Sequence, residues 1–343
     1  MKARSKAWLA VTAATGLAFM LSACGSSRPQ DSLSPQGPEA RKIDVLFKPV
    51  FWIAVGVFIL VEGLLAYALV RFRHKPGREV PAQVHGNRRL EIGWTILPTL
   101  LLAGIAVPTI GTIFSLANKP TGNVLEVTVT GHQWWWHIEY PALGVVTANE
   151  VHIPAGRPVY ITLTSKDVIH SFWVPRLAGT QDLEPGRTSH LTIQADEPGV
   201  YLGQCKEYCG ISHANMRFRV IAQTEDDFQA WAHQQLELAA PPGAEALAVM
   251  QQRSCGGCHT IGGVEGFGGI LGPDLTHFGG RTTFAGGMLD NNEANLTEWF
   301  RDPQHVKPGN DMTIAPGIPP QPGPSGLSDD QIRALIVYLE SLQ

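Results

Sequence analysis

Two long apolar runs near the start of the chain constrain its fold more than any other feature. Residues 49–70 are apolar except for Glu62, and a second apolar run extends from residue 92 to about residue 116. At about 1.5 Å of rise per residue, the first run would span roughly 33 Å as a helix, which is enough to cross a bilayer core. The second run contains two prolines, which transmembrane helices tolerate where neighbouring groups satisfy the freed backbone. The runs therefore predict a transmembrane hairpin over residues 49–117.

The loop between the two runs is strongly basic. Only Glu79 and Glu91 oppose its cations, which are Arg71, Arg73, Lys75, Arg78, Arg88 and Arg89. Loops of this kind stay on the cytoplasmic side of the membrane under the positive-inside rule. Both ends of the hairpin are therefore expected to face outward, together with all of the chain that follows it.

The first 23 residues have the pattern of an export signal. A basic start precedes an apolar run over residues 8–20, which is too short to cross a bilayer but fits a signal-peptide core. The run ends in Leu21-Ser22-Ala23-Cys24, which resembles the lipobox of a bacterial lipoprotein signal, and the resemblance implies a lipid on Cys24. An uncleaved anchor and ordinary signal-peptidase cleavage are the alternatives. Residues 24–48 include a stretch rich in proline, serine and glycine and predict a flexible leader.

A cluster of soft metal ligands lies in residues 205–216. It contains the thiols of Cys205 and Cys209, the imidazole of His213 and the thioether of Met216. His170 lies upstream and could close the site from the opposite side. Such ligands select copper or zinc over magnesium and calcium, and two cysteines argue against a blue-copper centre with its single thiolate. Two bridging thiolates could hold two coppers, whereas a disulfide or a zinc site would use the same cysteines.

A second cysteine motif indicates covalent heme. The run Cys255-Gly256-Gly257-Cys258-His259 has the C-x-x-C-H form of c-type heme attachment, in which the histidine binds the iron and a methionine commonly binds opposite it. Met312 follows residues 307–311, which resemble the loop before the distal ligand in cytochromes c, and Met288 is the alternative. By the same resemblance, the carbonyl of Pro273 accepts a hydrogen bond from the heme-ligating histidine.

Two folded domains are expected after the hairpin. Short alternating runs separated by proline and glycine predict a small antiparallel β-sandwich over residues 121–222. Residues 223–243 read as a linker that could include a short helix, and residues 244–343 as an all-α module of the cytochrome c type. Ser328 and Gln331 have capping-box spacing at the start of its last helix. The first and last helices of that fold cross and pack together.

The metal ligands resemble a known centre. The pattern of His170 followed by C-x3-C-x3-H-x2-M over residues 205–216 resembles the CuA motif of subunit II of the heme-copper cytochrome c oxidases. The resemblance implies a cupredoxin fold for residues 121–222 and a dinuclear copper bridged by two cysteines, with the full ligand set His170, Cys205, Glu207 through its carbonyl, Cys209, His213 and Met216. It also implies that the Glu207 carboxylate reaches a magnesium shared with subunit I. Lys206 departs from the small residue usual in the family but removes no ligand.

Two further residues receive roles from the resemblance. The run 131–137 contains three successive tryptophans, and on a strand Trp134 and Trp136 would share one face while Trp135 takes the other. The run resembles the aromatic patch over CuA, which implies that Trp134 receives electrons from cytochrome c; structural packing is the alternative. Glu91 matches the family glutamate at the cytoplasmic entrance of the K proton channel, against the alternative of a solvated helix end. Glu62 receives no role.

The resemblance covers nearly the whole chain after the signal and implies a multidomain membrane protein of the bacterial cytoplasmic membrane. It would be the electron-accepting subunit of a proton-pumping cytochrome c oxidase, with oxygen reduction in subunit I. Expected partners are subunit I, subunit III, and a donor such as a quinol-cytochrome c reductase or a small cytochrome c. A net charge of -4 argues against nucleic acid. The alternatives are a CuA-containing nitric oxide reductase and a free-standing electron carrier; the hairpin and fused heme argue against nitrous oxide reductase.

Overall fold

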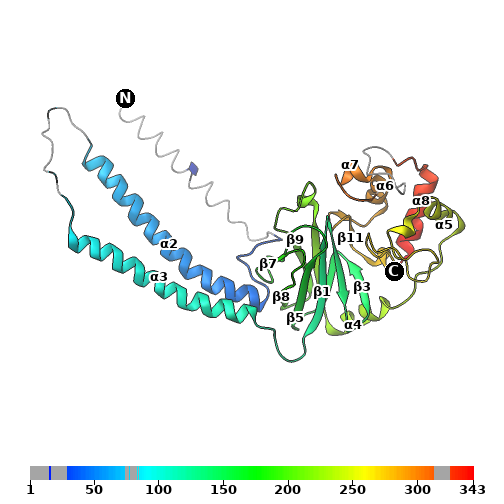
Figure 1. Cartoon of the computed structure of the whole chain (residues 1–343), viewed down its shortest axis with the longest axis horizontal. Coiled ribbons are helices and arrows are strands. Elements are labelled where there is room, and N and C mark those ends of the chain that lie inside the picture. Colours follow the sequence, from blue (N-terminus) through cyan, green and yellow to red (C-terminus); the bar gives the residue numbers. More distant parts are fainter. Residues whose placement is uncertain (1–14, 17–28, 74–76, 78–82, 84, 313–324) are drawn as a thin grey trace.

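The chain folds into three parts that follow one another in sequence. The computed structural model describes residues 15–16, 29–73, 77, 83, 85–312 and 325–343. Figure 1 shows a pair of long helices, a β-sandwich at one end of the pair, and a small helical module beside the sandwich. Cys24 lies outside the described residues.

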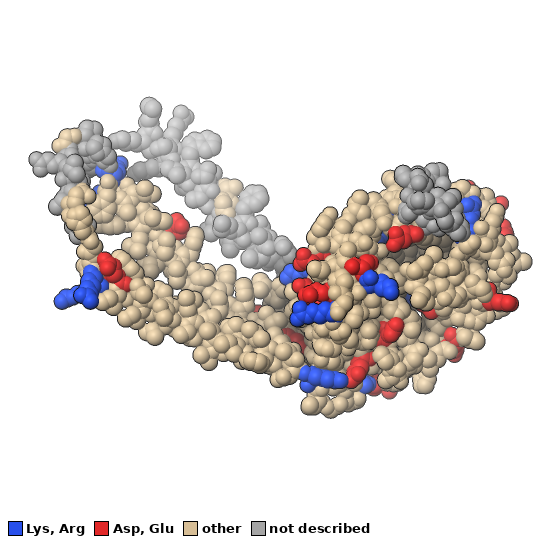
Figure 2. Space-filling view, in the orientation of Figure 1, with Lys and Arg blue, Asp and Glu red and all other residues tan. Residues whose placement is uncertain are grey.

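The long helices form the expected hairpin. Helix α2 (Pro38–Arg71) has 34 residues and α3 (Arg88–Ala117) has 30, and both are long and apolar enough to cross a membrane. Large apolar side chains point outward along both, as shown by Leu69 and Val107, which are 75% and 73% exposed. In Figure 2 the surface of the hairpin is free of charge over most of its length. Such a surface is suited to lipid or to other membrane subunits.

Helix α2 begins earlier than expected, so the prediction of a flexible leader up to residue 48 was wrong for residues 38–48. Pro38 occupies the first helical turn, where its fixed φ favours helix and its missing N–H costs nothing. The start of the helix also docks on the sandwich: the Gln36 N–H donates to the Arg176 carbonyl at 2.7 Å, and the Ala40 N–H donates to the Leu177 carbonyl at 3.1 Å. These contacts tie the outer end of the hairpin to the folded domain.

The β-sandwich consists of two five-stranded sheets, ordered β3-β2-β1-β5-β8 and β4-β10-β9-β6-β7. The strands are β1 (Leu125–His132), β2 (Trp135–Tyr140), β3 (Val145–Ala148), β4 (Glu150–Pro154), β5 (Val159–Ser165), β6 (His170–Trp173), β7 (Thr180–Leu183), β8 (Ser189–Ile193), β9 (Gly199–Cys205) and β10 (Arg217–Gln223). Inward residues alternate along β1, and a cluster of Trp136, Phe172 and Phe218 fills the centre of the core. This cluster lies next to His170, whose ring is 6.0 Å from that of Trp136.

The expectation of a purely antiparallel sandwich was wrong. Strands β1 and β5 pair in parallel, with Val127 opposite Ile161, and so do β4 and β10. Parallel partners need a long connection between them, and the intervening strands supply it in both cases.

The segment expected as a linker is partly structural. Helix α4 (Glu225–Gln234) is capped by Thr224 and packs on the sandwich through Phe228 and Trp231. The Trp231 ring stacks on His152 at 4.1 Å. The short helix expected in this segment is therefore present, and its apolar face makes it part of the sandwich domain, so residues 223–234 are not a linker.

The C-terminal module is helical, as expected. Its helices are α5 (Ala244–Gln252), α6 (Glu293–Arg301), α7 (Pro303–Val306) and α8 (Asp329–Ser341), with 3-10 turns η2 (Cys255–Gly257) and η3 (Phe278–Gly280) and a short ribbon of β11 (Thr283–Phe284) and β12 (Leu289–Asp290). Helices α5 and α8 pack together through residues such as Val249 and Leu335. The Ser328 and Gln331 capping box is confirmed at the start of α8.

Candidate metal centre and heme pocket

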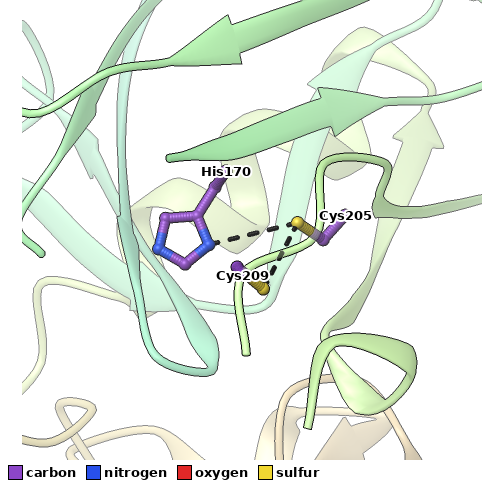
Figure 3. A group of neighbouring side chains, drawn as sticks. All are labelled: His170, Cys205 and Cys209. Atoms are coloured by element: carbon purple, nitrogen blue, oxygen red, sulfur yellow. Dashed lines mark hydrogen bonds between the residues drawn. The ribbon is translucent and has the colours of Figure 1, made fainter. Parts of the chain in front are cut away.

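Three buried ligand groups meet at one end of the sandwich. His170 begins β6, Cys205 ends β9, and Cys209 lies in the loop that follows. The Cys205 and Cys209 sulfurs are 3.7 Å apart, and the His170 Nδ1 is 4.0 Å from the Cys205 sulfur. Figure 3 shows the three side chains pointing toward one another. Their ligand atoms lie within 4.8 Å of one another, close enough to share a metal site.

The remaining expected ligands converge on the same two sulfurs. The His213 Nδ1 and the Met216 sulfur lie 3.5 Å and 3.8 Å from the Cys209 sulfur, and the Glu207 carbonyl oxygen lies 3.2 Å from that of Cys205. Both cysteines are free thiols. Two thiols, two imidazoles, a thioether and a carbonyl around one sulfur pair fit a site for a soft metal such as copper.

The loop that carries these ligands is held tightly. The Cys205 N–H donates to the Met216 carbonyl at 2.9 Å, so the first and last ligands of the loop are joined. Gly210 has φ of +121°, and a Cβ there would lie 2.9 Å from both Gln133 and Trp134. A side chain at position 210 would therefore displace the tryptophan turn from the metal loop.

The contact between the two sulfurs separates the pKa values of the two thiols. It is the largest influence on Cys205 and lowers the pKa of its thiol, whereas the same contact and burial raise the pKa of the Cys209 thiol. Metal binding by both cysteines requires both thiols to be deprotonated, so it releases protons.

Asp167 orients the His170 ring. Its carboxylate is 2.8 Å from the His170 Nε2 and also accepts the Gln133 N–H at 2.6 Å. Burial opposes ionisation of Asp167, but these hydrogen bonds together lower the pKa of its carboxyl group. The contact leaves the His170 Nδ1 free to face the sulfurs. Sequence reasoning missed Asp167, although its position three residues before a ligand histidine could have indicated it.

Replacing Asp167 with alanine should weaken copper binding by roughly 10- to 100-fold, the usual cost of losing a carboxylate that orients a metal-binding histidine. Competition with a chelator, followed through the copper-to-protein ratio of the purified complex, measures the change. Asp182→Ala, which removes an exposed carboxylate from β7, is the control and should leave copper binding unchanged. Equal binding by both variants would contradict the role of Asp167.

A large cavity lies between the helical module and the sandwich. It measures about 510 Å³, and its lining includes Cys255, Cys258, His259 and Met312 among largely apolar side chains. The His259 Nδ1 donates to the Pro273 carbonyl at 2.8 Å, which leaves Nε2 for a metal. Burial lowers the pKa of His259, so the ring is neutral, the form that binds iron. Two free thiols, an imidazole and a thioether in an apolar cavity fit a covalently attached heme.

The structure places the two candidate methionines differently. Met312 lines the cavity, and the Trp299 Nε1 donates to its sulfur at 3.0 Å. The Met312 N–H is held by the Asn310 side chain at 2.9 Å. Met288 lies in the turn between β11 and β12, outside the residues that line the cavity. The geometry thus favours Met312 as the second axial ligand.

Replacing Met312 with alanine should remove the absorption features of methionine-ligated heme while the heme stays covalently attached. The optical spectrum of the purified complex checks this, with covalent heme measured after denaturation. Met288→Ala is the matched control, since it removes the same side chain outside the cavity. A normal spectrum in Met312→Ala and an altered one in Met288→Ala would mean that Met288, and not Met312, binds the heme iron.

Trp134 lies between the metal loop and the heme pocket. It is only 7% exposed, lines the cavity, and donates from its indole Nε1 to the Cys209 carbonyl at 3.0 Å. Trp134 precedes β2, in the turn after β1, so the expectation that it shares a strand face with Trp136 was wrong. Trp136 is a core residue, and Trp135 is half-buried and stacks on His132 at 4.4 Å.

The other residues singled out in the sequence are exposed. Glu91 lies in the first turn of α3, where its carboxylate accepts the Asn87 N–H at 3.2 Å. Glu62 is exposed on α2, and the Glu207 carboxylate is exposed beside the metal loop. The Lys206 ammonium lies 4.6 Å from the centre of the Trp173 ring, a cation–π contact at the surface.

Comparison with known proteins covers all three parts of the chain. Residues 27–111 match the family described as cytochrome C oxidase subunit II, transmembrane domain; residues 142–224 match its periplasmic domain; and residues 244–343 match cytochrome c. Cytochrome c oxidase subunit 2 of Alkalihalophilus pseudofirmus is 41% identical over 95% of this chain and 95% of its own length. The Bacillus subtilis protein of that name is 31% identical over 98% of both chains. Quinol oxidase subunit 2 of Bacillus cereus is 31% identical over 70% of this chain and 84% of its own.

Proposed function

The chain belongs to the cytochrome c oxidase subunit II family, with a fused cytochrome c domain, and on that premise we propose that it accepts electrons at a covalent heme c and delivers them through a CuA centre to subunit I. The position of Trp134 is the main support for this proposal, because its side chain lines the heme pocket and also donates a hydrogen bond to the loop that holds Cys209. A contact of this kind joins the two redox sites through protein atoms alone.

The residues of the chain have separate tasks in this function. When bound, heme c and the copper pair each supply a one-electron redox centre. Cys255 and Cys258 would tether the heme, and His259, oriented by Pro273, and Met312 would hold its iron. Cys205 and Cys209 would hold the coppers, together with the side chains of His170, His213 and Met216 and the carbonyl of Glu207. Burial holds His170, Cys205, Cys209 and Met216 in place.

The membrane hairpin supports assembly with the oxygen-reducing subunit. Its two spans expose apolar side chains along their length, and the folded domains lie on the periplasmic side. We place subunit I, and with it subunit III, against this surface. Glu91 at the start of α3 would lie at the cytoplasmic entrance of a proton channel, which suits a proton-pumping oxidase. The exposed Glu207 carboxylate, next to the copper loop, would reach a magnesium at the subunit I contact.

The proposal also includes a lipid on Cys24 and an upstream donor, either a quinol-cytochrome c reductase or a small cytochrome c. A lipid at the N-terminus would add a second anchor beside the hairpin, whose outer end is already tied to the sandwich through Gln36 and Ala40. The intact mass of the mature chain tests the anchor, and an unmodified N-terminus would contradict it.

Gas consumption by the purified complex tests the function as a whole. With reduced cytochrome c as donor, we expect oxygen uptake that requires both metal sites, and proton release outside vesicles that contain the complex. Consumption of nitric oxide without oxygen uptake would instead identify a CuA-containing nitric oxide reductase.

A further inference from the structure

Two buried charged side chains cross the boundary between the sandwich and the helical module, here called the seam. The first is Glu150, which begins β4 and is 1% exposed. Its carboxylate accepts the Thr283 N–H and hydroxyl, both at 2.8 Å, and the Thr282 N–H at 3.0 Å. The Thr282 hydroxyl also donates to it. All four donors belong to the helical module, so the carboxylate is satisfied only when the module is docked.

The second is Lys307, which crosses the seam in the opposite direction. This residue of the helical module is 3% exposed, and its ammonium donates to the Trp134 carbonyl at 2.6 Å and to the Ala285 carbonyl at 2.7 Å. It forms no ion pair with any carboxylate in the described part of the chain. Burial lowers the pKa of Lys307 to about 7, and the group keeps enough N–H donors for both carbonyls in its charged and its neutral form.

The backbones of the sandwich and the helical module also contact each other closely in the region of Glu150 and Lys307. The Arg217 N–H donates to the Gly286 carbonyl at 2.7 Å, and the Ser212 hydroxyl donates to the Pro308 carbonyl at 2.5 Å. Gly309 has φ of +79°, and a Cβ there would lie 2.5 Å from Ile211 and 3.0 Å from Trp134. The loop that begins at Lys307 therefore lies directly on the tryptophan turn.

Buried charges of this kind determine how the two domains are aligned more than how tightly they bind each other. Taking a carboxylate and an ammonium out of water is costly, so their hydrogen bonds do no more than offset that cost. A docking shifted by one residue would leave at least one charge buried without its donors or acceptors, which is far more costly. The observed arrangement is the one in which Glu150 and Lys307 are both satisfied.

We propose that Glu150 and Lys307 are positioning residues, which lock the heme module in a single register against the CuA domain and so hold Trp134 between the two redox sites. The inference rests on the proposed function, in which an electron crosses this seam. Neither residue touches a metal ligand in the described structure. Each acts by fixing the backbone of the opposite domain.

Hydrogen exchange of the whole purified complex tests the lock. The reporter is the Arg217 amide, which crosses the seam but contacts neither positioning residue. Lys307→Met and Glu150→Ala should each raise exchange in peptides that contain Arg217 by roughly tenfold, the factor expected when a hydrogen bond to a charged group is lost. Glu150→Gln keeps an acceptor oxygen and should retain most of the protection. Asp290→Asn removes an exposed seam carboxylate, 2.9 Å from Arg219, and should change little.

Electron transfer from heme to copper in the same samples, followed after photoreduction of the heme, supplies the second measurement. Lys307→Met and Glu150→Ala should make it slower and multiphasic, with heme and copper contents at wild-type levels, and Glu150→Gln should restore a single phase. Unchanged exchange and rates in both loss variants would overturn the lock. If the wild type shows no electron transfer from heme to copper, the proposed function is refuted. The hydrogen-exchange measurements would still test the positioning role of Glu150 and Lys307 by themselves.

Discussion

Replacing Cys209 with serine should leave the oxidase complex without its copper centre and lower oxygen consumption by more than roughly 100-fold. This loss is larger than the usual loss from replacing a residue that only orients a metal ligand. Cys209 contacts several of the other ligands: its sulfur lies within 4 Å of the Cys205 and Met216 sulfurs and of the His213 ring nitrogen. A serine oxygen is a harder and shorter ligand that suits copper poorly at this position. The copper-to-protein ratio and the near-infrared absorption of the purified complex measure the loss.

The heme provides an internal control for this variant, because its attachment residues lie in a separate domain and should remain fully loaded. Tyr208→Phe is the matched control for the loop; its side chain is 75% exposed and supplies no ligand, so copper should be retained. Copper at the wild-type level with an unchanged near-infrared spectrum in Cys209→Ser would contradict the assignment of a thiolate-bridged pair. Stoichiometric zinc in the wild-type protein would do the same.

Replacing Trp134 with phenylalanine should slow electron transfer from heme to copper by roughly tenfold or more, since small displacements at a reacting site are enough for losses of this size. The phenyl ring lacks the N–H that bonds to the Cys209 carbonyl, and it is too short to fill the space between that loop and Gly309. Both redox sites should stay loaded, because Trp134 is not a ligand of either. Photoreduction of the heme in the oxidised complex, with both redox sites followed by their absorption, measures the rate.

Trp231→Phe makes the same chemical change in a tryptophan of α4 that stacks on His152 and does not line the heme pocket. It should transfer electrons at the wild-type rate. Equal rates in the two variants would mean that Trp134 only packs the seam.

The sequence predicted which metal-binding side chains come together, because most of them are close in sequence. Cys205, Cys209, His213 and Met216 lie in one loop, and their spacing is enough to indicate a soft-metal site before any fold is known. The attachment motif around Cys255 is local in the same way. The distant ligand His170 was also identified, because a lone histidine at a strand start fits the same resemblance.

The features that sequence reasoning missed depend on contacts between distant segments. Glu150 and Thr283 are separated by 133 residues, and Lys307 and Trp134 by 173, so no local pattern links them. The burial of Trp134 likewise comes from the docked helical module. The misplaced start of α2 has a similar cause, because Gln36 and Ala40 are held by the sandwich rather than by the preference of their own segment.

The order in which the two redox sites accept electrons tests the central claim most directly. With the oxygen site blocked by cyanide, the complex is mixed rapidly with reduced cytochrome c, and heme c and CuA are followed at their separate absorption bands. The account predicts that heme c is reduced first and CuA after it, and that Trp134→Phe delays only the second phase. Reduction of CuA ahead of heme c, or at an unchanged rate in Trp134→Phe, would contradict it.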